Sequence, residues 1–209
     1  MSDLHSWLTR FPEVRWVPLF DTDDTLVVRT HLRGPARDRR ILTRAPSFDT
    51  AMIDVIETGL QDETWTGLLY LMGLGDTAQA FTPLYIGKTE RRGKTHAVSR
   101  NIANIRRNPD KFARWRYGLD YHLGDLSHAL FGFSAYREPT KKYQRWAAAL
   151  FTTFDPPVLK APVTMLLLPW YEHSRGPSGF LTSVASAEKE VIALAGALHP
   201  DALLNVDGR

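Results

Sequence analysis

The stretch Leu84-Tyr85-Ile86-Gly87-Lys88-Thr89 gives the first indication of the fold. Its aliphatic and aromatic residues favour a β-strand. A second apolar run, residues 67–72, precedes it, and the turn-prone residues 73–76 separate the two runs. The sequence therefore predicts an antiparallel β-hairpin with a long loop.

A basic helix is predicted after this hairpin, over about residues 95–107. Its apolar residues recur at the i, i+4 and i+7 spacing of one helix face: Val98, Ile102 and Ile105. The dipeptide Asn108-Pro109 ends the pattern, because proline cannot continue a helix. The apolar face is expected to point inward and to leave Arg100 on the surface.

The rest of the chain completes a mixed α+β pattern. Further helices are predicted over about residues 47–60, 141–151 and 186–198, and a third strand over residues 163–170. Residues 111–136 carry no regular period. We expect a small antiparallel three-stranded sheet that is flanked by helices.

The domain organisation follows from where these elements fall. Residues 1–64, with a short apolar alternation over residues 14–20, are expected to form an N-terminal extension that packs on the core. The main domain then spans residues 65–209, with an inserted helical segment at about residues 109–160. A chain of 209 residues fits one such domain with elaborations.

Composition excludes several kinds of site. The chain has no cysteine, so it has no disulfide, thiolate zinc site or cysteine nucleophile, and a bound metal requires oxygen or imidazole ligands. The first residues lack the pattern of a signal peptide. No apolar run approaches the ~18 residues of a membrane span. We expect a cytoplasmic protein with no membrane contact.

The distribution of charge is more informative than its sum. The net charge is only +3. Residues 88–116, however, contain ten basic residues against two acidic ones, with three aromatic residues interleaved: Phe112, Trp115 and Tyr117. Such a segment is typical of a surface that contacts phosphates, although a solvated helix face has a similar composition.

Two tripeptides in the hairpin suggest a family. Leu68-Leu69-Tyr70 and Tyr85-Ile86-Gly87 resemble the Gly-Ile-Tyr and Tyr-Ile-Gly strands of the GIY-YIG nucleases. The second tripeptide matches fully, whereas the first keeps only the tyrosine. The resemblance extends over about residues 65–205 and implies a GIY-YIG-like core that hydrolyses phosphodiester bonds.

The resemblance also implies roles for the two tyrosines. Tyr85 lies beside the attacking water, as its base or to position it, and Tyr70 supports the same site. Because a free tyrosine has a pKa near ~10, base duty requires positive charge nearby, which Lys88 and the helix arginines would supply. The alternative for each tyrosine is packing on a sheet.

The resemblance further implies that a single glutamate early in the last helix binds the metal, Mg²⁺ or Mn²⁺, and this helix offers two. At ~100° per residue, Glu188 lies about 60° from the apolar face centred near Val191, and Glu190 about 100° away on the other side. Glu188 is therefore the preferred ligand and Glu190 the alternative. Either glutamate also suits the positive end of a helix.

Asparagine and arginine complete the implied site. Asn205 resembles an asparagine that organises the family's site by hydrogen bonds, although it also suits a turn. The family's Arg and His, four residues apart, match Arg92 and His96 by spacing, but both precede the predicted helix. Arg100 reaches the same surface, so the choice between Arg92 and Arg100 stays open.

The inserted segment adds further candidates. His122 and Asp125 are candidates for acid–base or metal functions, although a histidine beside a turn is more often structural. The aromatic residues of 112–117 are candidates for stacking on bases, with core packing as the alternative.

The predicted function is metal-dependent cleavage of DNA, with double-stranded DNA as the partner and restriction or defence as the context. An inactive nucleic-acid-binding module, and a toxin or effector nuclease, are the alternatives. The sequence does not decide between a monomer and a homodimer.

Overall fold

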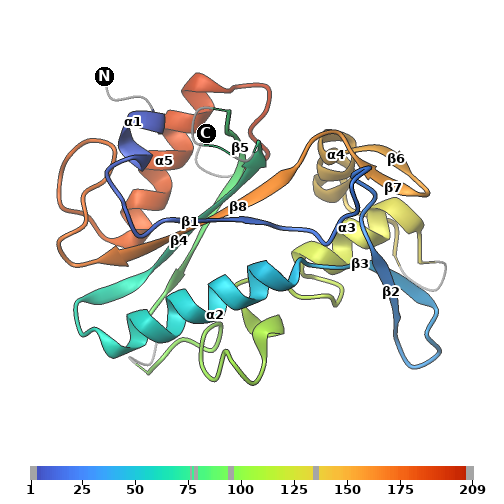
Figure 1. Ribbon diagram of the computed structural model, residues 1–209, viewed down its shortest axis with the longest axis horizontal. Helices are drawn as coiled ribbons and strands as arrows, with labels where there is room; N and C mark the ends of the chain where they lie inside the picture. Colours follow the sequence, from blue (N-terminus) through green and yellow to red (C-terminus); the bar gives the residue numbers. More distant parts are fainter. Residues whose placement is uncertain (1–3, 76, 78–79, 94–96, 134–136, 206–209) are drawn as a thin grey trace.

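The computed structural model describes residues 4–75, 77, 80–93, 97–133 and 137–205. A four-stranded antiparallel sheet with strand order β1-β8-β4-β5 forms its centre (Figure 1). The bounds are Arg15–Pro18 for β1, Trp65–Leu74 for β4, Thr82–Glu90 for β5 and Val163–Tyr171 for β8. The expected α+β class is confirmed. The expected three-stranded sheet is wrong, because the apolar alternation over residues 14–20 forms β1 and pairs with β8.

Successive strand residues point to opposite faces of the sheet, so each strand has side chains on both faces. Helices cover both of these faces. Helices α1 (Leu4–Leu8) and α5 (Val184–Leu198) lie on one face, where α5 packs on β4 and β5. Helix α2 (Pro46–Gln61) lies on the other (Figure 1). Each face has its own buried cluster: Leu69, Leu71 and Ile86 point toward α5, and Leu68, Tyr70 and Met72 point away from it.

A second group of elements lies beyond one end of the sheet (Figure 1). It contains the hairpin β2 (Thr30–Arg33) and β3 (Arg39–Leu42), and the hairpin β6 (Phe151–Phe154) and β7 (Pro157–Leu159). Helices α3 (His122–Phe131) and α4 (Lys141–Leu150) pack against each other here. Residues from both the N-terminal segment and the inserted segment thus build this part of the molecule.

The segment predicted as a helix over residues 95–107 is not helical in its described part. Residues 100–107 form turns, and Asn104 has a φ of 55°, which an α-helix does not allow. Ile102 and Ile105 are nevertheless buried, whereas Val98 is 46% exposed. The spacing of Ile102 and Ile105 therefore reflects their burial and does not indicate a helix. A short 3₁₀ helix, Pro109–Lys111, follows.

Helix α3 occupies part of the segment that has no period in the sequence. Its first seven residues, His122 to His128, are all buried. A helix that is buried on every side shows no amphipathic alternation, which explains why the pattern does not reveal it. Among the described helices, none is long and apolar enough to cross a lipid bilayer.

Candidate functional site

The two tyrosines lie on the same face of the β4–β5 hairpin. Tyr70 is paired with Gly87, and Tyr85 with Met72. The Tyr70 phenol lies across Gly87, since a Cβ atom at position 87 would stand 2.5 Å from Tyr70 Oη. Tyr70 is only 3% exposed, whereas Tyr85 is half-buried. Of the two, Tyr85 is therefore the one that solvent and a substrate can reach.

Aromatic residues of the inserted segment cover this tyrosine pair. The Tyr85 ring centroid lies 4.8 Å from that of Trp146 and 5.1 Å from that of His122. The Tyr70 ring lies 5.5 Å from Phe112. Phe112 and Trp115 are fully buried, and Tyr117 is 8% exposed. The idea that these aromatic residues stack on bases is therefore wrong, because they form the core over the tyrosines.

Burial decides the protonation state of Tyr70. Loss of hydration raises the pKa of its phenol well above 10.0, and the negative charges of Tyr85 and Glu188 raise it further. The positive charge of Arg114 acts in the opposite direction but is outweighed. Tyr70 stays protonated at neutral pH and does not suit the role of a base.

His122 lies in the same buried cluster, on the first turn of α3. Its Nδ1 is 2.9 Å from the Tyr143 hydroxyl, and its buried Nε2 has no hydrogen-bond partner among the described residues. Burial, with the positive charges of Lys142 and Arg114, lowers the pKa of His122 well below 6.5. The imidazole is therefore neutral at physiological pH. A fully buried ring does not suit a general acid for a substrate.

Asp125 lies one turn after His122 on α3, but its carboxylate contacts Asp120 and Arg137 and not the tyrosine cluster. Its Oδ1 accepts a hydrogen bond from the Asp120 N–H at 3.1 Å and lies 3.7 Å from the Arg137 guanidinium. Burial raises the pKa of its carboxyl. These contacts give Asp125 a structural role in the turn before α3.

Three charged residues meet on the opposite side of the hairpin, between β5 and α5. Lys88 pairs with Leu69, whose side chain belongs to the core on the α5 face. The Lys88 Nζ lies 3.0 Å from Glu90 Oε1. Burial raises the pKa of Glu188 on α5, Lys88 lowers it and Glu90 raises it.

Glu190 points elsewhere. Its Oε2 accepts hydrogen bonds from the Ser178 N–H at 3.1 Å and from the Ser178 hydroxyl at 2.8 Å. A Cβ atom at Gly176 would stand 2.4 Å from the same oxygen, so the carboxylate is packed into the loop before α5. Glu190 therefore stabilises this loop, and of the two candidate ligands only Glu188 faces β5.

Asn205 is bound to the edge of β5. Its Oδ1 accepts from the Ile86 N–H, and its Nδ2 donates to the Ile86 carbonyl oxygen, both at 2.9 Å. The preceding Leu204 N–H donates to the Leu84 carbonyl at 2.6 Å. The Asn205 amide thus substitutes for a neighbouring strand and holds the residues on either side of Tyr85.

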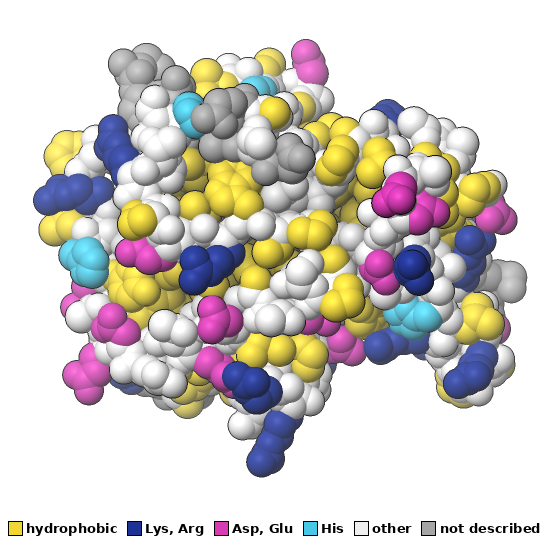
Figure 2. Space-filling model, in the orientation of Figure 1, with side chains coloured by type: hydrophobic (Ala, Val, Ile, Leu, Met, Phe, Trp, Pro, Cys, Tyr) yellow, Lys and Arg dark blue, Asp and Glu magenta, His cyan; other side chains and the backbone are white. Residues whose placement is uncertain are grey.

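The basic residues of 88–116 are dispersed. The Arg91 guanidinium donates to main-chain carbonyls at the end of α2, and Arg106 pairs with Glu57 on the same helix. Arg92 and Arg100 are exposed, and His96 lies outside the described residues. On the face shown in Figure 2, Lys and Arg side chains are scattered among acidic and apolar ones. The structure does not gather them into one stripe on that face.

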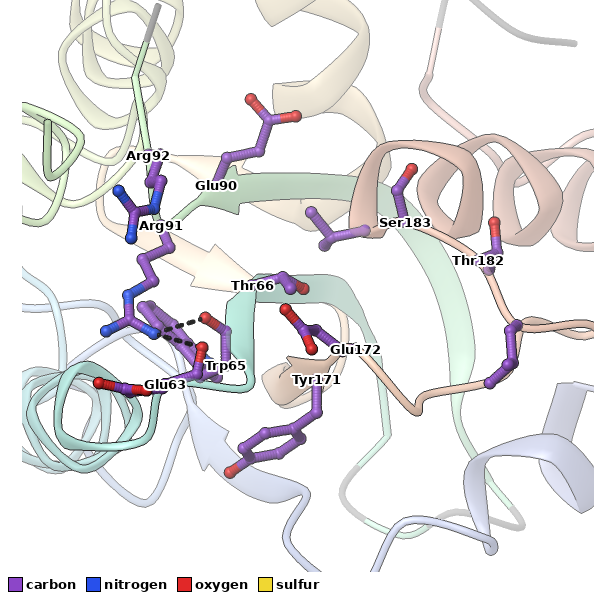
Figure 3. A pocket seen from close by; sticks show the side chains of 12 residues that line it. Glu63, Trp65, Thr66, Glu90, Arg91, Arg92, Tyr171, Glu172, Thr182 and Ser183 are labelled. Carbon is purple, nitrogen blue, oxygen red and sulfur yellow. Dashed lines mark hydrogen bonds between the residues drawn. The ribbon is translucent and has the colours of Figure 1, made fainter. Parts of the chain in front are cut away.

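A cleft of about 680 Å³ lies beside the charged group, at the end of the sheet where β5 ends and α5 begins. Figure 3 shows Glu90, Arg91 and Arg92 on one side of it and Ser183, the N-cap of α5, on the other. The Arg91 guanidinium donates hydrogen bonds to the carbonyls of Glu63 and Trp65. Glu90 lines this cleft and also forms an ion pair with Lys88. Both residues influence the pKa of Glu188, so Glu188 lies next to the cleft.

The carboxylates fit a hard divalent cation only in part. Within the described residues, no group of three or more His, Asp or Glu side chains could hold a metal ion. Mg²⁺, however, is usually bound by one or two carboxylates together with waters and substrate phosphates. Glu188 and Glu90 offer two such oxygen ligands, and a cation would compensate the burial that raises the pKa of Glu188.

Two cations that the sequence reasoning missed lie near the tyrosines. Lys142 Nζ is 5.3 Å from the centroid of the Tyr85 ring, and the Arg114 charge acts on Tyr70. Both residues belong to the inserted segment. The only sequence signals were the pair Lys141-Lys142 before a helix and one arginine among several, and neither signal points to the tyrosines.

Comparison of the chain with protein-family models, with curated protein sequences and with solved structures gives no match. A functional conclusion therefore depends on the residues themselves. Four of them come from distant parts of the chain and surround the middle of β5: Tyr70, Tyr85, Glu188 and Asn205.

Proposed function

We propose that the protein is a metal-dependent endonuclease that hydrolyses DNA phosphodiester bonds. Its core, formed by β4, β5, β8 and α5, would be of the GIY-YIG type. One observation supports this proposal most strongly: Tyr70, Tyr85, Glu188 and Asn205, which the family resemblance singles out, lie around a single strand. This convergence supports the proposal beyond the tripeptide match alone.

Each residue has a role that suits its surroundings. Tyr85, the more accessible phenol, positions the attacking water. Tyr70 stays protonated and supports the site from its buried position. Asn205 fixes the backbone at Ile86 and so the direction of Tyr85. Glu188, with Glu90 nearby, would hold Mg²⁺ or Mn²⁺, which when bound stabilises charge on the phosphate oxygens.

A cleavage assay tests this proposal. Purified protein is incubated with supercoiled plasmid, linear duplex and single-stranded DNA, with Mg²⁺, Mn²⁺ or EDTA. We expect metal-dependent cleavage of duplex DNA that Glu188→Gln removes and Glu190→Gln retains. Intact DNA under every condition, with folded protein, would refute the proposal.

Two observations favour a second candidate, a DNA-binding module without catalysis. The aromatic cover leaves Tyr70 only 3% exposed, and the described part of the segment that would carry a catalytic arginine is not helical. Such a module would bind duplex DNA without cleaving it. Its affinity would be the same for Glu188→Gln and for the wild type, which separates the two candidates in one set of measurements.

A further inference from the structure

A smaller hollow lies beside the cleft, at the same end of the sheet. Its volume is about 290 Å³, and Tyr171 at the end of β8 lines both the hollow and the cleft. The two spaces are therefore neighbours. The lining of the hollow comes from two segments that are distant in the sequence, residues 10–13 after α1 and residues 169–175 at and after the end of β8.

The buried Trp7 fixes the backbone of both arginines that line the hollow. Its carbonyl accepts the Arg10 N–H at 3.2 Å, and its indole N–H donates to the Arg175 carbonyl, also at 3.2 Å. The loop after Arg175 is closed by a hydrogen bond from the Gly176 N–H to the Phe180 carbonyl at 3.0 Å. Two cations from opposite ends of the chain are thus held at one hollow.

Both guanidinium groups keep donors that no protein group uses. Arg10 and Arg175 are exposed. Arg175 Nη1 donates to the Gly179 carbonyl at 2.9 Å, which orients the group without compensating its charge. Over the described residues, neither guanidinium forms an ion pair. Glu13 also lines the hollow, so two positive charges there face one negative charge.

Ser174 adds a buried hydroxyl to the same lining. It is 7% exposed, and its Oγ accepts the Tyr171 N–H at 2.9 Å. A serine hydroxyl that accepts a hydrogen bond still has its own proton to donate. The hollow therefore combines guanidinium and hydroxyl donors, and such donors match the acceptor oxygens of a phosphate.

We propose that this hollow binds a phosphate of the DNA backbone, which Arg10 and Arg175 hold next to the cleft. The inference rests on the proposed function, because the DNA at the cleft brings the phosphate. Successive phosphates of one strand are about 3.4 Å apart along the helix axis, so a strand at the cleft has further phosphates for the adjoining hollow. Such a contact positions the duplex and reads no base.

Binding of a duplex oligonucleotide with 5′-hydroxyl ends in EDTA tests the inference, because every phosphate is then internal and metal-dependent cleavage does not occur. Each phosphate contact adds about 0.9 to the slope of log affinity against log salt. Both arginines would hold the same phosphate, so the double variant Arg10→Met with Arg175→Met should reduce the slope by about 0.9, and either single variant by less. The matched double variant is Arg37→Met with Arg145→Met, at two exposed positions away from the hollow, and should leave the slope unchanged.

Removal of the negative charge from the hollow should have the opposite effect. Glu13→Gln is expected to strengthen binding of the same duplex, and Glu138→Gln at an exposed position elsewhere should not change it. Melting temperatures separate charge from packing. Arg10→Met should not alter the melting temperature, whereas Arg175→Met loses the bond to Gly179, and Arg175→Lys should restore the salt slope.

Equal slopes for the two double variants, weaker binding by Glu13→Gln, or no binding by the wild type would overturn the inference. The expected slopes without cleavage in Mg²⁺ would refute the proposed hydrolysis and leave the phosphate site standing. Cleavage with unchanged slopes would refute the phosphate site and leave the hydrolysis standing.

Discussion

Gly87 and Tyr70 are directly paired in the β4–β5 ladder, and the phenol of Tyr70 lies where a side chain of residue 87 would stand. The glycine of the Tyr-Ile-Gly tripeptide thus has a steric function. It leaves room for the Tyr70 phenol to lie over β5, the outermost strand of the sheet.

Gly87→Ala is expected to displace Tyr70 and to lower both stability and cleavage. The new methyl group would approach Tyr70 Oη to 2.5 Å, and such overpacking costs about 1 to 3 kcal/mol. Thermal unfolding and cleavage rates measure the two effects. Gly93→Ala is the control, since its Cβ would meet no atom closer than 3.9 Å. Equal behaviour of the two variants would contradict the steric role of Gly87.

Glu188→Gln and Glu190→Gln are expected to have opposite effects. Glu188→Gln should reduce cleavage by about 100-fold, the scale of losing one group that stabilises developing charge. It should not reduce stability, because burial raises the pKa of Glu188 and so disfavours its ionised form in the fold. Glu190→Gln should weaken two hydrogen bonds to Ser178 and lower stability by about 1 kcal/mol, with cleavage retained. The reverse pattern would reassign the metal ligand.

Stability is expected to fall as the pH is lowered through 6.5, in part because of His122. Its pKa is lowered in the fold, so below pH 6.5 the unfolded chain binds a proton that the native imidazole does not. Denaturant unfolding at pH 5 to 8 measures the slope, which for one proton is at most about 1.4 kcal/mol per pH unit.

His122→Phe should reduce this slope, and His173→Gln at an exposed position should leave it unchanged. Some slope will persist, because burial also lowers the pKa of His31. An undiminished slope in His122→Phe would show that the imidazole is accessible to protons in the fold.

Asn205→Ala is expected to release the edge of β5. It leaves the buried Ile86 N–H and carbonyl without their side-chain partners, which costs about 1 to 3 kcal/mol for each polar group that stays unsatisfied. Hydrogen exchange at the Ile86 amide should accelerate, and cleavage should fall. The exposed Asn101→Ala is the control. Unchanged exchange at Ile86 would show that another group protects this edge.

Much of the sheet was predictable from the sequence. Local periodicity predicts β4, β5 and β8 and the helices α2, α4 and α5. Each of these elements buries one or both of its faces over several residues, and this burial gives its sequence a recognisable apolar pattern. The convergence of Tyr70 and Tyr85 follows from strand alternation. The fourth strand of the sheet, β1, was not predicted. It has only four residues, and its pairing with β8 is non-local.

The charged part of the site was less predictable. Helix periodicity favoured Glu188 over Glu190 as the metal ligand. The hydrogen bond that Glu190 accepts comes from Ser178 in an irregular loop, and periodicity does not predict such a contact. Lys142 and Arg114 approach the tyrosines only because the inserted segment folds back over the hairpin. Such tertiary contacts leave no local pattern, and the apolar spacing of Ile102 and Ile105 was misleading for the same reason.

Asn205 and the N-terminal residues also determine how this protein must fold. The Asn205–Ile86 hydrogen bonds join residues 119 positions apart, and the bond from Trp7 Nε1 to the Arg175 carbonyl joins residues 168 positions apart. Contacts between such distant residues slow folding, because the chain entropy is lost before they form. Refolding should therefore wait for the two ends of the chain to meet on the sheet. Until then the unpaired edges of β5 and β8 are open to intermolecular pairing, so dilute protein should refold in higher yield than concentrated protein.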